Sequence, residues 1–501
     1  MALVGVDGAS WEVLSPLLSQ RRLPNLEKLY RAGSAGLMRS IEPTDPAALW
    51  TSMATGKSRG AHGIDRVIEK VPGRYAVRPV SADRRRVPAL WTIAAANGIT
   101  SGVAGWPVTF PAERIGGFLV VPGYEPGSPA ERGFIHPEGA FGREADAQPG
   151  LVLSERAAKT AALDPALAEA MQDDLAILGW SLSLYRVYQP RVLLLRFRSV
   201  DLASHSHWPS DAAEGSADSS PAIGGAYEFL DEWMGHLLEA LPEQTALLIV
   251  SDHGFSGIAP GQGRHLDMDR LLEKMGYLRR DPTGRPDWKE TRAFGMDDGI
   301  GTRRWVYLNV QGEEEAGVVE PGTSESLRTE LAAGLRSLTT AQGERLFTNL
   351  SVQKGPGPGA PDLEATENPK VTADGAIVLS GGKRVSLEDL YRPASGSAGA
   401  HDTRGILLAV GAGIAQGRRE WQSDLYDVAP TLLYLLHLPL ASDMPGRPIE
   451  AILGARVPSD YPQIQTYNAL PAAPPPLFRP EAIIEKELAE LKRAGHLIEP
   501  E

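Results

Sequence analysis

Six aspartate and histidine residues of this sequence have the types and positions that a divalent-metal site requires. They are Asp7, Asp201, His205, Asp252, His253 and His401. Apolar, strand-like runs precede Asp7, Asp201 and the Asp252-His253 pair, and another follows His401. Because residues just past the carboxyl ends of strands converge on one crevice of an open α/β sheet, we expect these side chains to meet. The sequence therefore predicts a metallohydrolase with a two-metal site.

The spacing within this set indicates how ions are shared. If a helix begins at Asp201, then Asp201 and His205 face the same side one turn apart and can reach one ion. Asp252 and His253 are adjacent, so we expect them to point to opposite sides, which suits two ions about 4 Å apart. Mixed aspartate and histidine ligation favours Zn²⁺, with Mn²⁺ or Fe²⁺ as alternatives.

Each of these motifs also has a purely structural interpretation when it is taken alone. Asp7 after a strand is typical of a helix N-cap, and the Asp201 and His205 pair is typical of a solvated helix face. The Asp252-His253 pair before a glycine is typical of a turn. Their common placing next to strands is what favours the metal site.

Composition limits the other classes of function. The chain has 501 residues, a formal charge of −13 and 42% hydrophobic residues, which is typical of a globular enzyme and unfavourable for a nucleic-acid surface. With no cysteine, the metal ligands must be histidines and carboxylates. No apolar run is long enough for a membrane span and no signal peptide is visible, so we expect a cytoplasmic protein acting on a small molecule. The oligomeric state is not predictable.

Alternating strands and helices predict an α/β fold with a doubly wound, mostly parallel sheet and an inserted smaller lobe. We expect a core in two parts, residues 1–254 and 399–465, with a loop or cap at about 123–160. The inserted lobe is expected over residues 255–398. A proline-rich linker at 466–480 and a C-terminal helix at 481–501 complete the prediction.

Several segments carry a resemblance to a known family. They are VGVDGASWEVL, LWTSMATGKSRGAHGI, RSVDLASHSHW, VSDHGF, AHDTRGILLAVGAGI and LYDVAPTLLYLLHLPLASDMPGRPI. Together they resemble the alkaline phosphatase superfamily, and within it the type I phosphodiesterase/nucleotide pyrophosphatase branch, over roughly residues 1–455. The resemblance implies an alkaline phosphatase-like fold and two divalent ions, usually zinc. It implies one ion at Asp201, His205 and His401, and the other at Asp7, Asp252 and His253.

The nucleophile position departs from the pattern of that family. The family places a serine or threonine at the start of the helix that leads into Ala54-Thr55-Gly56, and counting back from Gly56 puts Pro46 there. Proline has no nucleophilic atom, although it suits the first helical position. One interpretation is that Thr44 serves after a small register shift, and a second is that a metal-bound hydroxide attacks or Asp45 takes a metal-facing place. The remaining possibility is a chain without efficient covalent turnover.

Two smaller features follow this helix. His62, in a turn, is expected to be structural, and Lys57 and Arg59 are expected at the solvated surface, where they could also attract an anion. The sequence as a whole predicts a hydrolase of phosphate mono- or diesters. The alternative is a catalytically impaired family member that binds metal or a phosphate ligand, or acts in an assembly.

Overall fold

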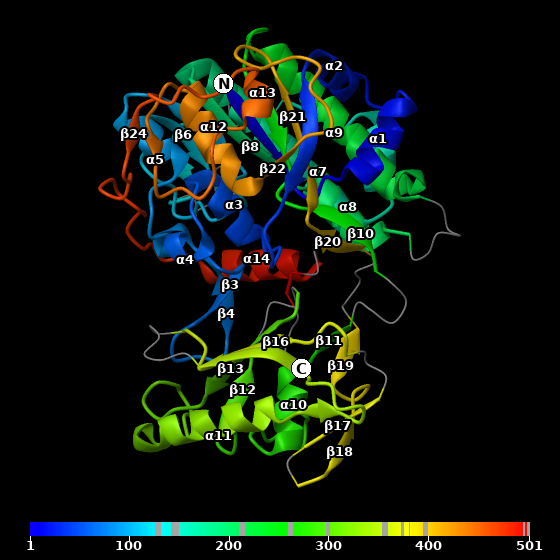
Figure 1. Cartoon of the computed structure of the whole chain (residues 1–501), viewed down its shortest axis with the longest axis vertical. Helices are drawn as coiled ribbons and strands as arrows, with labels where there is room; N and C mark the ends of the chain where they lie inside the picture. The colour runs from blue at the N-terminus through cyan, green and yellow to red at the C-terminus, as the bar shows by residue number, and fades with distance from the viewer. Residues whose placement is uncertain are drawn as a thin grey trace. The chain divides into compact units, whose positions relative to one another are not determined.

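A computed structural model of the chain (Figure 1) describes residues 1–125, 132–141, 150–209, 216–258, 264–296, 301–352, 359–371, 375–379, 381–393, 399–493 and 496–497. The chain forms two compact units, each with its own hydrophobic core. Unit 1 comprises residues 1–66, 80–257 and 398–487. Unit 2 comprises residues 67–79, 258–397 and 488–501.

A mostly parallel sheet of nine strands forms the centre of unit 1, which confirms the predicted α/β architecture. The strand order is β22-β2-β21-β9-β1-β8-β5-β6-β7, and the five strands from β9 to β6 are parallel to one another. β21 is antiparallel to β9 and β2, and β7 is antiparallel to β6. The strands are β1 (Ala2–Val6), β2 (Ser34–Arg39), β5 (Ser101–Ala104), β6 (Gly117–Val120), β7 (Ile135–His136), β8 (Val192–Phe197), β9 (Leu247–Val250), β21 (Arg404–Val410) and β22 (Gln422–Asp424).

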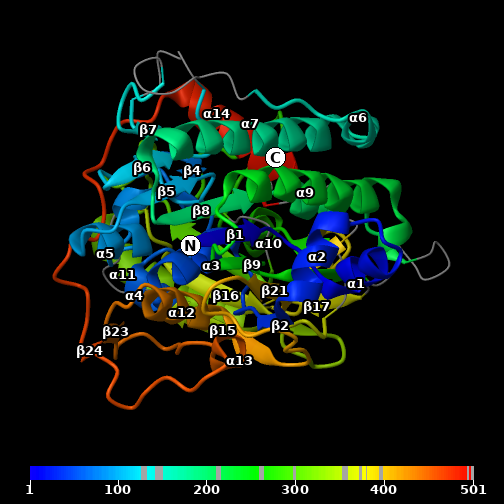
Figure 2. The same cartoon turned by 90° about the horizontal axis from the view of Figure 1, so that it is seen from above.

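Helices cover both faces of this sheet. α7 and α9 lie on one face and α3 and α12 on the other (Figure 2). The helices are α1 (Trp11–Ser19), α2 (Pro24–Ala32), α3 (Pro46–Thr55), α4 (Arg59–His62), α5 (Leu90–Ala96), α6 (Glu155–Ala161), α7 (Pro165–Tyr188), α8 (Ser199–His207), α9 (Pro221–Ala240), α12 (Val428–Leu435), α13 (Glu450–Leu453) and α14 (Glu481–Arg493), of which residues 481–487 belong to unit 1. Two short strand pairs lie outside the main sheet. β10 (Gly254–Gly257) pairs with β20 (Gly399–Asp402) in antiparallel fashion, and β23 (Leu440–Ala441) pairs with β24 (Gln463–Ile464) in parallel fashion.

The local sequence explains where the elements next to the site begin. The Asp164 carboxylate caps α7 by accepting from the Ala166 amide, and Pro165 occupies the first helical position. β8 is apolar except for Arg196, as expected for a parallel strand with both faces covered.

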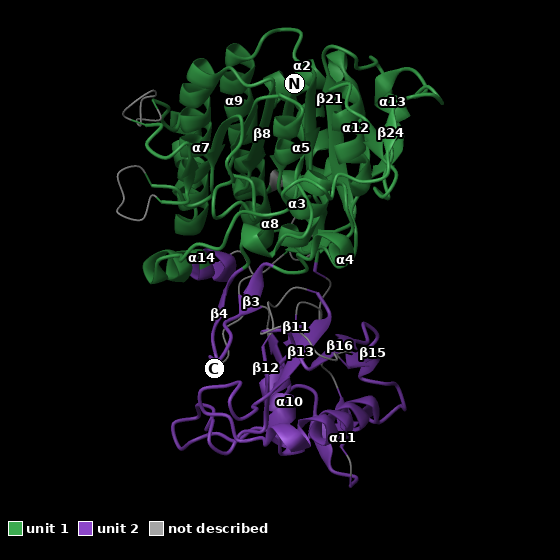
Figure 3. Ribbon diagram, turned by 90° about the vertical axis from the view of Figure 1, so that its left-hand side faces the viewer, with its two compact units in different colours: residues 1–66, 80–257, 398–487 green, residues 67–79, 258–397, 488–501 purple. Residues whose placement is uncertain are grey.

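Unit 2 is built around an antiparallel sheet in the order β12-β13-β16-β15 (purple in Figure 3). Its core includes Trp305 of β13 and Leu331 of α11. Its elements are β3 (Ile68–Lys70), β4 (Val77–Pro79), β11 (Arg264–Leu266), α10 (Met268–Met275), β12 (Ala293–Gly295), β13 (Arg303–Leu308), α11 (Ser324–Arg336), β14 (Thr339–Thr340), β15 (Phe347–Val352), β16 (Leu363–Glu367), β17 (Ala376–Val378), β18 (Arg384–Ser386) and β19 (Tyr391–Pro393).

The β3–β4 hairpin supplies part of the core of unit 2. The ring of Tyr75 stacks on Trp288 with the centroids 3.7 Å apart, and its hydroxyl donates to Asn309 Oδ1 at 2.6 Å. Lys70 Nζ donates to both carboxylate oxygens of Glu314, at 2.7 and 2.8 Å. The hairpin is therefore fixed to unit 2 by an aromatic stack and an ion pair.

The ends and loops of the chain differ in detail from the prediction. The predicted cap at 123–160 contains β7 and the start of α6, and residues 126–131 and 142–149 of it lie outside the described residues. The linker at 466–480 contains no helix or strand. Of the predicted C-terminal helix, α14 covers Glu481–Arg493, and residues 494, 495 and 498–501 lie outside the described residues. Among the described residues, no helix is both long and apolar enough to span a membrane.

Candidate metal centre

The structure brings the six predicted residues together at one end of the unit 1 sheet. Asp7 directly follows β1, Asp252 and His253 follow β9, and His401 lies on β20. Asp201 and His205 both lie on α8, which begins just after β8. Their ligand atoms form two groups, each with its atoms within 4.8 Å of one another: Asp201, His205 and His401 in one, and Asp7, Asp252 and His253 in the other.

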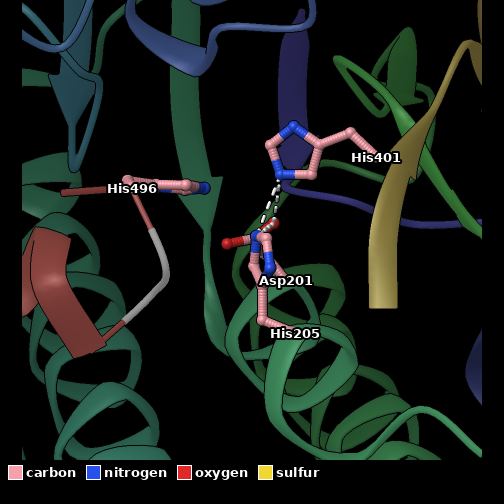
Figure 4. Close-up of side chains that lie close together, drawn as sticks. All are labelled: Asp201, His205, His401 and His496. Atoms are coloured by element: carbon pink, nitrogen blue, oxygen red, sulfur yellow. Dashed lines mark hydrogen bonds and ion pairs between the residues drawn. The ribbon is translucent and has the colours of Figure 1, made fainter. Parts of the chain in front are cut away.

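Asp201 lies at the centre of the histidines. Its Oδ1 atom is 3.6 Å from His205 Nε2 and 3.8 Å from the Nε2 atoms of both His253 and His401. Figure 4 shows Asp201 and His205 projecting from one helix toward the ring of His401. The Nε2 atoms of His205 and His401 are 2.9 Å apart. Asp201 and His205 thus share one helix face, as their spacing predicts.

The second group is fully buried. His253 Nε2 is 3.4 Å from Asp7 Oδ1 and 3.6 Å from Asp252 Oδ2. Asp252 and His253 therefore point into the same group, and the expectation that they face opposite sides is wrong. The alternation of side chains holds only within an extended strand, and β9 ends at Val250, before this pair.

Backbone carbonyls fix the tautomers of two histidines. His253 Nδ1 is 3.0 Å from its neighbour's carbonyl, Gly254 O, and His401 Nδ1 is 2.8 Å from Thr44 O. A carbonyl only accepts, so each Nδ1 carries the proton and donates it. Each Nε2 then presents a lone pair to the cluster, which is the arrangement of a metal-binding histidine with its supporting hydrogen bond.

Four buried atoms of the cluster lack a hydrogen-bond partner in the described part of the chain. They are Asp7 Oδ1, Asp201 Oδ1, Asp252 Oδ2 and His253 Nε2. All are acceptors, or become so through the tautomer just described, and buried acceptors without a donor are costly. Divalent cations would satisfy them, so the residues present fit such ions in donor type and placement.

The electrostatics of the cluster point the same way. Burial, followed by the charge of Asp7, raises the pKa values of Asp201 and Asp252 well above the usual range. Burial also acts to raise the pKa of Asp7, but the charge of the adjacent Arg196 guanidinium outweighs it and lowers that pKa to about 2. Three carboxylates in one buried space thus repel one another, and a cation would relieve that repulsion.

The start of α8 depends on a residue that the sequence analysis missed. Asp174 of α7 is buried, and its carboxylate accepts from the Ser199 amide at 2.9 Å, the Ser199 hydroxyl at 2.5 Å and the Arg198 amide at 3.0 Å. The N-cap residue of α8, Arg198, makes no side-chain cap of its own. Asp174 therefore caps the helix that presents Asp201 and His205.

Arg196 is the second residue that the sequence analysis missed. Its guanidinium forms an ion pair with Asp7 Oδ2. The available signal was a single charge in the otherwise apolar run of β8, because a buried arginine needs a buried partner. The sequence alone did not indicate that this partner is Asp7.

Pro46 occupies the first position of α3, where the family has its nucleophile, as the sequence predicts. Pro46 is the first residue of α3, and the Asp45 carboxylate caps the helix by accepting from the Ala48 amide at 3.3 Å. Thr44 is half-buried, and its carbonyl accepts from His401, which places its backbone beside the first group. The helix thus starts without a serine or threonine at its first position.

The residues that follow α3 are structural. The Ile64 amide donates to His62 Nδ1 at 3.1 Å, so His62 carries its proton on Nε2, which is 2.9 Å from Ser52 Oγ. His62 therefore cannot accept a proton from Ser52. Lys57 is buried and pairs with Asp443, so its predicted surface position is wrong, and Arg59 donates to the carbonyls of Pro43 and Asp65.

Comparison with known proteins identifies the family. The family model for type I phosphodiesterase / nucleotide pyrophosphatase matches residues 1–375. The chain belongs to this family. A comparison with curated proteins gives no significant match.

The chain is similar to two solved structures, and the first of them shares its fold. Human ectonucleotide pyrophosphatase / phosphodiesterase 5 is 16% identical with a TM-score of 0.50, and the match covers 89% of this chain and 96% of that one. Phosphonoacetate hydrolase from Sinorhizobium meliloti 1021, in complex with phosphonoacetate, is 15% identical with a TM-score of 0.45 and coverages of 85% and 93%. The family is metal-dependent, and the two ligand groups are where this chain could bind metal.

Proposed function

We propose that this chain is a phosphoric ester hydrolase that holds two divalent cations, with Zn²⁺ the first candidate. The observation that supports it best is the set of four buried, unpartnered acceptor atoms among the described residues, in a chain of the phosphodiesterase family. Asp201, His205 and His401 would hold one cation. Asp7, Asp252 and His253 would hold the other.

The residues of this chain have separate tasks in such a site. When bound, the cations would supply Lewis-acid stabilisation of the charge on a phosphoryl group. His253 and His401 keep their Nε2 lone pairs directed inward through their backbone hydrogen bonds. Burial of Asp7 and Asp252 keeps bulk water from their oxygens, which strengthens every electrostatic contact there.

Thr44 is the proposed nucleophile. Its carbonyl is bound to a proposed metal ligand, His401, and it is the hydroxyl residue nearest in sequence to the start of α3. A nucleophile beside cations needs less assistance to lose its proton. This assignment extends the small shift from Pro46 that the sequence suggests.

The test is a hydrolysis assay with p-nitrophenyl phosphate and bis(p-nitrophenyl) phosphate, with added Zn²⁺ or Mn²⁺ and with a chelator. We expect metal-dependent turnover, and a fall in kcat of about 10³-fold or more in Thr44→Ala. Thr51→Ala is the matched control, since the Thr51 hydroxyl is engaged with the Ala47 carbonyl within α3. Turnover that survives in Thr44→Ala would remove Thr44 as the nucleophile while leaving hydrolysis in place.

A second candidate function follows from Pro46 alone. If neither Thr44 nor a metal-bound hydroxide acts, the helix start offers no other nucleophilic atom, since Pro46 has none and Asp45 is engaged as the cap. The chain would then be a catalytically impaired member that binds metal or a phosphate ligand, or acts in an assembly. Zinc uptake without turnover of any ester would support this function.

A further inference from the structure

Arg196 is confined between an aromatic ring and the metal-ligand cluster. It lies opposite Gly5 in the β1–β8 pairing. A Cβ atom at Gly5 would lie 2.4 Å from the Trp50 ring, so the ring rests directly on this glycine. The guanidinium carbon of Arg196 is 5.9 Å from the centroid of the same ring. The arginine therefore has a cation–π contact on one side and Asp7 on another.

The ion pair leaves Asp7 with a single available oxygen. Oδ2 accepts from Arg196, while Oδ1 has no hydrogen-bond partner in the described ranges and lies 3.4 Å from His253 Nε2. Arg196 thus occupies the side of Asp7 opposite to the proposed cation position. It also limits the negative charge that Asp7 offers to an ion.

Arg196 also compensates the negative charge of the cluster. Among the described residues, no other arginine or lysine forms an ion pair with Asp7, Asp201 or Asp252. The neighbouring Arg198 pairs with Asp173 instead, at 3.0 Å. Arg196 is thus the cation that is ion-paired within the cluster, among the described residues, whereas the charge of Arg198 acts on Asp201 without a direct ion pair.

We propose that Arg196 compensates the charge of the metal-free centre and, by doing so, weakens its affinity for a divalent cation. The cluster then stays folded without metal. Its affinity for a divalent cation is lower than it would be if the three carboxylates had no arginine beside them. The effect of Arg196 on cation affinity rests on the proposed function. The two effects are linked, because whatever stabilises only the metal-free state must lower the affinity for metal.

The test compares full-length wild type with Arg196→Met at pH 8. Zinc affinity is measured by competition with a chromophoric chelator, and stability by chemical denaturation with and without zinc. We expect Arg196→Met to be less stable without metal and yet to bind zinc about tenfold more tightly. Arg196→Lys should lie between the two, since it keeps the charge but loses the planar fork. A role in packing alone would lower both stabilities equally and leave the affinity unchanged.

Arg198→Met is the matched control, as it removes a charge two residues away that is paired outside the cluster. We expect it to change zinc affinity by less than about threefold. Weaker or unchanged zinc binding in Arg196→Met, with normal uptake by wild type, would overturn the inference and leave the proposed function intact.

If wild type takes up no zinc, the proposed function fails and the metal-free protein still decides the inference. Arg196→Met should then lower the unfolding free energy of the wild-type protein. In an Asp7→Asn background the same substitution should lower it much less, because the charge that Arg196 compensates is already absent. Equal costs in the two backgrounds would overturn it.

Discussion

The buried acidic cluster of unit 1 differs from the buried ion pairs of unit 2. In unit 2, Lys70 meets Glu314, and Arg304 Nη2 lies 2.5 Å from Glu367 Oε1. The second oxygen of Glu367 accepts from the Tyr391 hydroxyl at 3.0 Å. In unit 1, three carboxylates share one space, and each has an oxygen without a hydrogen-bond donor in the described part of the chain.

This difference separates structural charge from a binding site. A buried ion pair whose charges cancel needs no further ligand. Removing one partner destabilises the fold, because the other charge is left buried and unpaired. A buried group with excess negative charge is incomplete and gains stability from a cation. Burial alone would not distinguish the two regions, but the balance of charges does.

The largest expected effect is on the complete pair of unit 2. Glu367→Gln removes the charge opposite Arg304, and we expect unit 2 to lose about 3 kcal/mol of unfolding free energy, since one buried partner remains charged. Hydrogen exchange of β13 and β16 measures it. The loss should be the same with and without zinc. If the loss of unfolding free energy in unit 2 depended on zinc, the proposed distinction between the ion pair of unit 2 and the cluster of unit 1 would be wrong.

The next effect concerns Asp252 in the incomplete group. At a zinc concentration 100 times the dissociation constant, wild-type unit 1 should gain about 2.7 kcal/mol, and unit 2 nothing. Asp252→Asn should lose most of this gain, while in chelator it should be at least as stable as wild type because repulsion is relieved. Asp402→Asn is the control, because Asp402 adjoins His401 in sequence but is bound to Arg404. A wild type that zinc does not stabilise would remove the distinction between the units.

A smaller effect should follow from the cap of α8. Asp174→Ala should cost about 1–2 kcal/mol as a lost N-cap and also weaken zinc binding about tenfold, because α8 carries Asp201 and His205. Ser154→Ala removes a comparable cap from α6, which carries none of the six residues. It should cost about 1 kcal/mol and leave zinc affinity unchanged. If both variants bind zinc like wild type, Asp174 does not position the ligands.

The smallest expected difference between the units is in their response to acid. Burial, then Arg59 in unit 1 and Arg304 in unit 2, lowers the pKa values of His62 and His265 to about 3. Because the unfolded chain binds these protons first, stability is full above about pH 6.5 and falls as the pH drops toward 3. The slope is at most about 1.4 kcal/mol per pH unit for each histidine.

His62→Gln should flatten this slope in unit 1 and leave unit 2 unchanged. Denaturation at several pH values between 4.5 and 7 measures it, with hydrogen exchange reporting on each unit. An unchanged slope in unit 1 would show that His62 is not the group that titrates.

The sequence predicts the scaffold of the site better than its electrostatics. Each of the six residues adjoins a recognisable strand or helix, so topology alone brings them together. Asp174 was missed because nothing in the helical pattern of α7 indicates that its carboxylate caps a different helix. The orientation of Asp252 and His253 was mispredicted because the strand rule was applied beyond the end of β9.

The hairpin of unit 2 shows a second limit of the sequence. Lys70 and Tyr75 stand in a short polar segment with no hydrophobic periodicity. Their partners Glu314 and Asn309 are 244 and 234 positions away. Local patterns carry no information about contacts of that range, so neither β3 nor β4 could be predicted.

That hairpin also means that the lobe is not encoded by one continuous stretch of the chain. A fragment cut out at residues 258–397 would leave Tyr75 behind, and with it the ring that covers Trp288. Glu314 would lose its lysine as well. A chimera that exchanges this lobe with that of a relative must therefore carry two pieces of sequence, and alignments of the insertion alone will miss the first.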